Sequence, residues 1–75
     1  MTAGNDQEKI GERLQRFREI RGITRTVLAQ KLGMTETDLV EVEAGRKPLS
    51  KKSVETLREV FSLDPGWLFG GKHSF

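Results

Sequence analysis

The sequence predicts a single all-α domain of five short helices. Apolar residues recur at the three- to four-residue spacing of a helix, glycines follow the first three periodic segments, and no segment alternates apolar and polar residues as a strand would. The 75 residues are enough for one small core and leave no room for a second. We therefore interpret residues 1–75 as one domain and expect a flexible N-terminus over 1–5 and a flexible tail over 70–75.

The first two helices are each expected to end before a glycine. The first is predicted over about 6–21, and Gly22 would stop it in the left-handed conformation. The second begins after Thr24, a good N-cap, and runs to Leu32, before Gly33. Apolar residues at helical spacing indicate the faces turned to the core: Ile10, Leu14, Phe17 and Ile20 in the first helix, and Val27, Leu28, Ala29 and Leu32 in the second.

Two further N-caps and a proline indicate three more helices. Thr35 would cap a third helix that Gly45 terminates, and Ser50 would cap a fourth. Pro65 suits an early position of a short fifth helix. The side chains expected in the core are Leu39 and Val42 of the third helix, Val54, Leu57, Val60 and Phe61 of the fourth, and Trp67, Leu68 and Phe69 of the fifth. Trp67 and Phe69 could instead form an exposed contact patch, although aromatics at this spacing are more often core.

Composition excludes several classes of protein. The chain has no cysteine, which excludes disulfides and thiolate metal sites. Its apolar runs are only a few residues long and its N-terminus is polar and acidic, so we expect neither a membrane span nor an export signal, and we expect a cytoplasmic protein. It has no nucleophile–base pair, glycine-rich phosphate loop or metal-ligand cluster, and His73 is its only histidine. We therefore expect no enzyme activity, no cofactor and no metal.

Charge is weakly basic overall but unevenly distributed. Thirteen Lys and Arg residues against 11 Asp and Glu residues give a net charge of +2. Residues 34–44 contain no Lys or Arg and carry four acidic residues: Glu36, Asp38, Glu41 and Glu43. The sequence therefore describes a basic body with one acidic segment, and that segment coincides with the predicted third helix.

The segment 24–39 has the organisation of a helix-turn-helix. Two short helices meet at a three-residue turn that begins with Gly33, and the small residue Ala29 lies where the second helix must approach the third closely. In this motif one helix braces across the DNA backbone while the next lies in the major groove. The motif therefore favours duplex DNA as the partner.

From Ile10 to Gly71 the chain also resembles the phage-repressor-like (Cro/repressor, XRE) helix-turn-helix family. The resemblance implies a lambda-repressor-like DNA-binding domain in which the second and third helices form the helix-turn-helix. The third helix, at about Thr35–Ala44, would then read the DNA, and the protein would act as a homodimer or beside a partner domain. The residues that carry the resemblance are Ile10-Gly11-Glu12-Arg13-Leu14, Arg18, Gly22-Ile23-Thr24, Leu28-Ala29, Leu32-Gly33-Met34-Thr35, Leu39, Val42-Glu43, Gly45 and the ending from Leu63 to Gly70.

The resemblance implies DNA contacts at the start of the second helix, on the third helix, and at the basic loop with the start of the fourth helix. The residue types fit, because helix N-termini and clustered Lys and Arg bind phosphates. Arg25 suits either a phosphate or a guanine. The resemblance further implies a partly buried, structural salt bridge between Arg18 and Glu43. The implied DNA contacts are Arg25 and Thr26, then Thr35, Glu36, Thr37 and Glu41, and then Arg46, Lys47, Ser50, Lys51 and Lys52.

The acidic third helix leaves three interpretations open. Glu36 or Glu41 could accept a hydrogen bond from cytosine N4. Glu36 and Asp38 could instead only complement the positive end of the helix dipole, which does not account for Glu41. The acidic face could also be adapted to a basic protein. We therefore expect a sequence-specific, repressor-like transcriptional regulator that binds duplex DNA, and the alternative is a protein–protein interaction module on the same scaffold.

Overall fold

The computed structural model describes residues 5–70, which form five helices and no strand, as predicted. The helices are α1 (Asn5–Arg21), α2 (Arg25–Leu32), α3 (Glu36–Glu43), α4 (Lys51–Phe61) and α5 (Pro65–Gly70). Helices α1 and α5 include Asn5 and Gly70, which were expected to be flexible. The rest of both predicted flexible ends, with His73, lies outside the described residues. None of the helices over 5–70 is long and apolar enough to cross a membrane.

The predicted caps fix the starts of three helices. The hydroxyls of Thr24, Thr35 and Ser50 each accept a hydrogen bond from the backbone N–H three residues later, at 3.2, 3.0 and 3.1 Å. Gly33 ends α2 with a φ of 71°, in the left-handed region that glycine adopts without strain. Helix α4 ends in a way that the sequence did not predict, because Ser62 is itself left-handed, with a φ of 58°. Because Gly33 ends α2, the chain turns there and α3 begins only three residues later, at Glu36.

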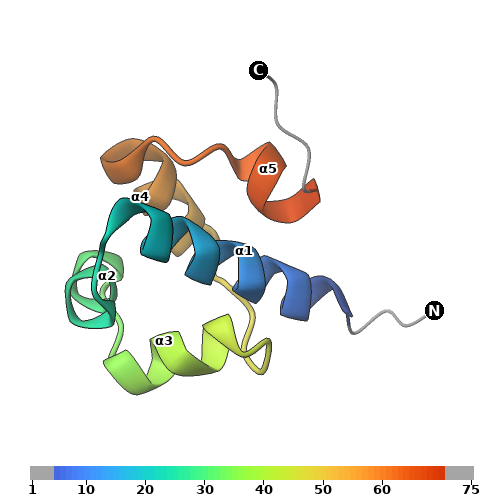
Figure 1. The fold of residues 1–75 in the computed structure, drawn as a ribbon, viewed down its shortest axis with the longest axis horizontal. Helices are drawn as coiled ribbons and strands as arrows, with labels where there is room; N and C mark the ends of the chain where they lie inside the picture. The colour runs from blue at the N-terminus through green and yellow to red at the C-terminus, as the bar shows by residue number, and fades with distance from the viewer. Residues whose placement is uncertain (1–4, 71–75) are drawn as a thin grey trace.

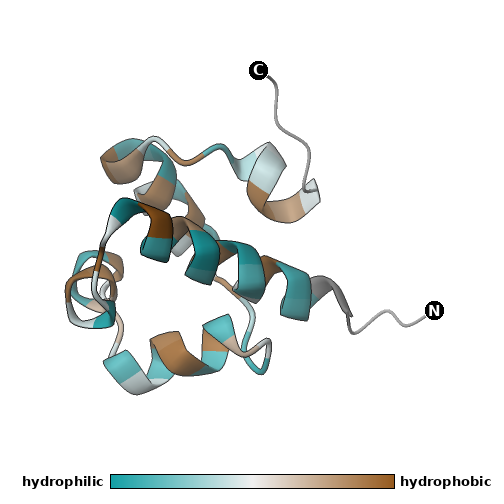
Figure 2. Cartoon of the chain, viewed as in Figure 1, coloured by the Kyte–Doolittle hydropathy of each residue, from teal (hydrophilic) through white to brown (hydrophobic). Residues whose placement is uncertain are grey.

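Helix α1 crosses the middle of the molecule, with α3 on one side and α4 and α5 on the other (Figure 1). Helix α2 stands at one end and packs against both α3 and α4, while α1 packs against α3 and α5. The rings of Phe17 and Phe61 meet edge to face with 5.8 Å between their centroids, which joins α1 to α4. Hydrophilic and hydrophobic residues follow one another along α1 and α3 (Figure 2), and the buried hydrophobic side chains form one core cluster.

The core is built from all five helices and the linker before α5. Most residues expected at the core are buried there or pack against it, Trp67 among the latter. Five are not: Ile20, Val27, Val60 and Phe69 are exposed, and Val54 is half-buried without packing against the core. The fully or nearly fully buried hydrophobic side chains are Leu14, Phe17, Leu28, Ala29, Leu39, Val42, Leu57, Leu63 and Leu68.

Helix geometry explains why three of these residues, Ile20, Val27 and Phe69, are exposed. Ile20 lies about a third of a turn round the helix from Leu14. The buried face of α1 turns the other way, toward α3, and includes Gly11 and Arg18, so Ile20 is left 74% exposed. Val27 and Phe69 each adjoin the buried leucine of their helix, and so lie about 100° round the helix from it.

Gly11 allows α1 and α3 to approach closely. A Cβ atom added at this glycine would overlap the carbonyl oxygens of Val42 and Glu43, which belong to the backbone of α3 and its last turn. The neighbouring atoms cannot move out of the way as a flexible side chain could. The last turn of α3 is therefore held directly against α1 because residue 11 has no side chain.

We expect Gly11→Ala to lower the free energy of unfolding by about 1–3 kcal/mol, since the added methyl group overpacks the contact between α1 and α3. Helix propensity alone would have the opposite sign, because alanine favours a helix interior over glycine by about 1 kcal/mol. Urea denaturation measures the change. Gly70→Ala is the control, because its Cβ would meet nothing within 4 Å. A more stable Gly11→Ala protein would contradict the close approach.

Candidate nucleic-acid interface

A buried carboxylate at the end of α3 connects that helix to α1 and to α2. Glu43 is the last residue of α3, and its side chain is only 2% exposed. Arg18 of α1 donates from Nε to one carboxylate oxygen of Glu43 at 2.8 Å and from Nη2 to the other at 3.4 Å. The remaining Nη1 of Arg18 donates to the carbonyl of Ile23 at 3.2 Å. The two residues that the family resemblance paired are thus partners in a buried, charge-assisted contact.

The same carboxylate also holds Arg25, which the sequence did not anticipate. Arg25 is the first residue of α2, and its Nε donates to Glu43 Oε1 at 3.0 Å. Its side chain is 42% exposed, so this arginine extends from the buried network to the surface. Two guanidinium groups on one carboxylate leave an excess of positive charge at the start of α2. Arg25 is therefore anchored at one nitrogen, close to the helix end where a phosphate would bind.

The basic loop folds back onto α3. Gly45 has a φ of 81°, and the backbone N–H groups of Arg46 and Lys47 donate to the carbonyl of Glu41 at 2.9 and 3.3 Å. Lys47 Nζ then lies 2.6 Å from a carboxylate oxygen of Asp38, and Arg46 Nη1 lies 3.5 Å from one of Glu41. Two residues expected at phosphates are thus paired with two carboxylates of the acidic segment.

The contact with Lys47 also changes how Asp38 titrates. The hydrogen bond and the charge of the ammonium hold the pKa of Asp38 below its ordinary value, and the same contact raises the pKa of Lys47. The pair therefore stabilises the fold at neutral pH, and this contribution is lost as the pH falls through the lowered pKa of Asp38. At high pH it is lost again when Lys47 gives up its proton.

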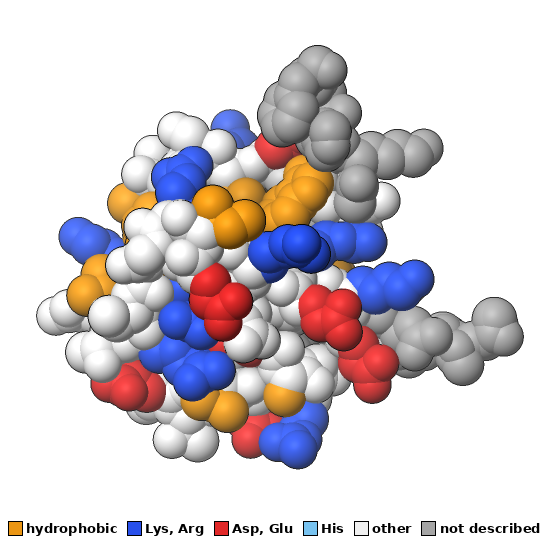
Figure 3. All heavy atoms as spheres, viewed as in Figure 1, with side chains coloured by type: hydrophobic (Ala, Val, Ile, Leu, Met, Phe, Trp, Pro, Cys, Tyr) orange, Lys and Arg blue, Asp and Glu red, His pale blue; other side chains and the backbone are white. Residues whose placement is uncertain are grey.

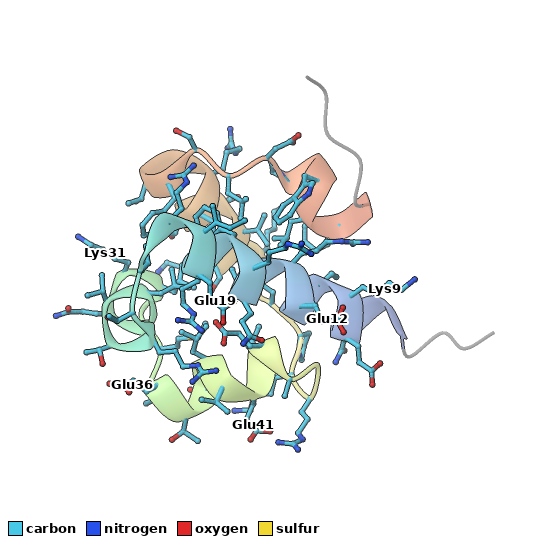
Figure 4. The ribbon with its side chains drawn as sticks, in the orientation of Figure 1. Lys9, Glu12, Glu19, Lys31, Glu36 and Glu41 are labelled. Carbon is cyan, nitrogen blue, oxygen red and sulfur yellow. The ribbon has the colours of Figure 1, made fainter. Side chains whose placement is uncertain are left out.

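Glu36 has a different kind of partner. The hydroxyl of Thr26 donates to Glu36 Oε2 at 2.6 Å, which ties the first turn of α2 to the first residue of α3. Figure 4 places Glu36 and Glu41 at opposite ends of α3, with Glu36 at the end near α2. The structure thus brings together Thr26 and Glu36, two residues ten positions apart that were expected at the DNA.

The other expected contacts lie at the starts of α3 and α4. The Thr35 hydroxyl is used as the cap of α3. Ser50 accepts from the Ser53 N–H and donates to the Ser53 hydroxyl at 3.0 Å. Thr37, Lys51 and Lys52 are exposed, and the two lysines are the first residues of α4.

The acidic segment is therefore not a uniform acidic face. Of its four carboxylates, those of Asp38, Glu41 and Glu43 contact four basic side chains. On the face shown in Figure 3, acidic and basic side chains are interspersed rather than separated. The local charge of −4 read from residues 34–44 is offset by basic groups that come from α1, from α2 and from the loop after α3.

Replacing the buried carboxylate of Glu43 should destabilise the fold far more than replacing the partly exposed one of Glu41. We expect Glu43→Gln to lower the free energy of unfolding by about 3 kcal/mol, because an amide cannot balance two partly buried guanidinium groups. Glu41→Gln is the matched control and should cost less than about 0.5 kcal/mol, since its partner Arg46 is 68% exposed. Urea denaturation compares the two variants, and equal losses would contradict the structural role of Glu43.

Comparison with known proteins agrees with this geometry. The family described as helix-turn-helix domain matches residues 9–66, which include all of α2, α3 and α4 and most of α1. Comparisons with curated proteins and with solved structures found no significant match. A helix-turn-helix places its second helix in the major groove, so the match indicates DNA binding in general terms. The chain belongs to the helix-turn-helix domain family.

Proposed function

We propose that this chain is a sequence-specific, repressor-like transcriptional regulator that binds duplex DNA with α3, about Thr35–Ala44, in the major groove. The observation that carries the proposal is the way α3 is presented. On the inner side of α3, Leu39, Val42 and Glu43 are buried. At its first turn, Glu36 and Thr37 are exposed. A single helix supported in this way has the width that the major groove admits.

Basic residues at two other helix starts supply the sequence-independent part of the affinity. Arg25 begins α2, and Lys51 and Lys52 begin α4. Each of these helix ends combines exposed backbone N–H groups with a full positive charge, which suits a phosphate. The phosphate contacts would position the protein on the duplex, and the first turn of α3 would read the bases.

Arg46 and Lys47 can contribute to the same phosphate contacts while they keep their carboxylate partners. Their side chains are 68% and 51% exposed, and their ion pairs with Glu41 and Asp38 lie at the surface. An ammonium group has three N–H donors and a guanidinium group has five, so each side chain can bond a DNA phosphate beside its carboxylate. The retained ion pairs keep the acidic helix from repelling the duplex.

The alternative function, a module that binds a basic protein, has less support than the sequence alone gave it. Its evidence was the acidic segment, and three of the four carboxylates there already have basic partners within the chain. The proposed regulator would act as a homodimer, or beside a partner domain, on two half-sites about one helical turn apart. This arrangement is supported by size, because a single module this small buries too little surface for tight, specific binding.

A salt titration tests duplex binding directly. We expect the logarithm of the association constant to fall linearly with the logarithm of salt concentration, and Lys51→Gln to reduce the slope by about 1, because one phosphate contact is removed. Arg58→Gln is the control, because it removes the same charge from the opposite end of α4 and should leave the slope unchanged. Undetectable binding to any duplex at low salt would overturn the proposed function.

A further inference from the structure

The carboxylates of the acidic segment differ in their partners, and this difference singles out Glu36. Asp38, Glu41 and Glu43 each contact at least one Lys or Arg. Within residues 5–70, the hydrogen bond that Glu36 accepts comes from the neutral hydroxyl of Thr26. Glu36 is an exposed side chain at the first residue of α3, and no Lys or Arg of residues 5–70 forms an ion pair with it.

Thr26 fixes the orientation of that charge. Its hydroxyl engages Glu36 Oε2 at 2.6 Å, the short distance typical of a hydrogen bond to an ionised acceptor. The other oxygen, Oε1, accepts no hydrogen bond from the part of the chain that the structure describes. A carboxylate held at one oxygen and open at the other is an acceptor prepared for one N–H donor. Glu36 stands at the end of α3 nearest α2 (Figure 4), where a helix entering the groove makes its base contacts.

We propose that Glu36 is a specificity-determining residue that reads a cytosine in the major groove, with Thr26 as its positioning residue. This inference rests on the proposed function. Of the groups that base pairs present in the major groove, cytosine N4 and adenine N6 are the hydrogen-bond donors. Adenine places its N7 acceptor beside N6, where it would repel a carboxylate, so cytosine is the better match.

The free-energy cost of removing the Glu36 carboxylate from water lets it discriminate cytosine from the other bases. Removing a carboxylate from water without a donor is strongly unfavourable. The acceptor atoms of guanine and thymine would leave Oε1 unsatisfied, so these bases are rejected at this position rather than merely bound less well. The paired carboxylates of Asp38 and Glu41 do not impose this cost, because their charges are already balanced.

Selection of bound sequences from a random duplex pool tests the inference. The wild-type protein should enrich a cytosine at one fixed position of each half-site, about tenfold or more over the other bases. Glu36→Gln should lose this preference and favour adenine there, because an amide can bond both N6 and N7 of adenine. Thr26→Val removes the hydroxyl with little change of shape and should weaken the cytosine preference, whereas Thr26→Ser should retain it.

Glu19→Gln is the matched control for the substitution at Glu36. Glu19 also accepts a hydrogen bond from a neutral side chain, that of Gln15 at 3.2 Å, but it lies on α1 (Figure 4). Its replacement should leave the selected sequence unchanged. An unchanged cytosine in sequences selected by Glu36→Gln would overturn the reading role, and an unchanged preference in Thr26→Val would overturn the positioning role. If no variant and no wild-type protein enriches any sequence, the proposed function itself fails.

Discussion

The carboxylate of Glu43 is the contact on which the placement of α3 depends. Glu43 is the last residue of α3, where its negative charge is repelled by the negative end of the helix dipole. Two arginines, from α1 and α2, neutralise this charge. Gly11 lies at the same junction and lets the backbones of α1 and α3 meet. The C-terminal end of α3 is thus anchored in the protein, and residues 35–37 at its other end are exposed.

The acidic side chains of α3 fall into two groups, one buried inside the protein and one nearer its surface. Glu43 serves the fold, and its partners are buried or half-buried. Asp38 and Glu41 lie nearer the surface, where contacts with Lys47 and Arg46 add little to stability but cancel the field that an acidic helix would present to DNA. Glu36 is left as the carboxylate with a neutral partner among these four. An acidic recognition helix is therefore compatible with a polyanionic ligand, provided that its charges are balanced from neighbouring segments.

Sequence patterns predicted the parts of this structure that depend on neighbouring residues. The caps at Thr24, Thr35 and Ser50 act within one turn of helix, and Gly33 acts at its own φ angle, so each could be assigned from local chemistry. The periodic apolar residues located the core but misplaced Ile20, because the pattern could not show that Gly11 and Arg18 would turn toward α3 in its place.

Contacts between segments could not be predicted in the same way. The bond from Arg25 to Glu43 spans 18 positions, and that from Lys47 to Asp38 requires the chain reversal at Gly45. Both depend on the crossing of helices and on side-chain rotamers, which no spacing rule specifies. Arg46 and Lys47 were accordingly assigned to phosphates by the family resemblance and by their charge. Only the folded chain reveals that they balance the acidic helix as well.

The most direct test of this account maps the surface that meets DNA. Amide chemical shifts of the 15N-labelled protein would be followed by NMR during titration with a duplex at low salt. We expect the largest changes at residues 25–26, 35–37 and 50–52, which are the starts of α2, α3 and α4. Changes confined to the outer surfaces of α1 and α5, or no change at all, would contradict the claim that α3 enters the groove.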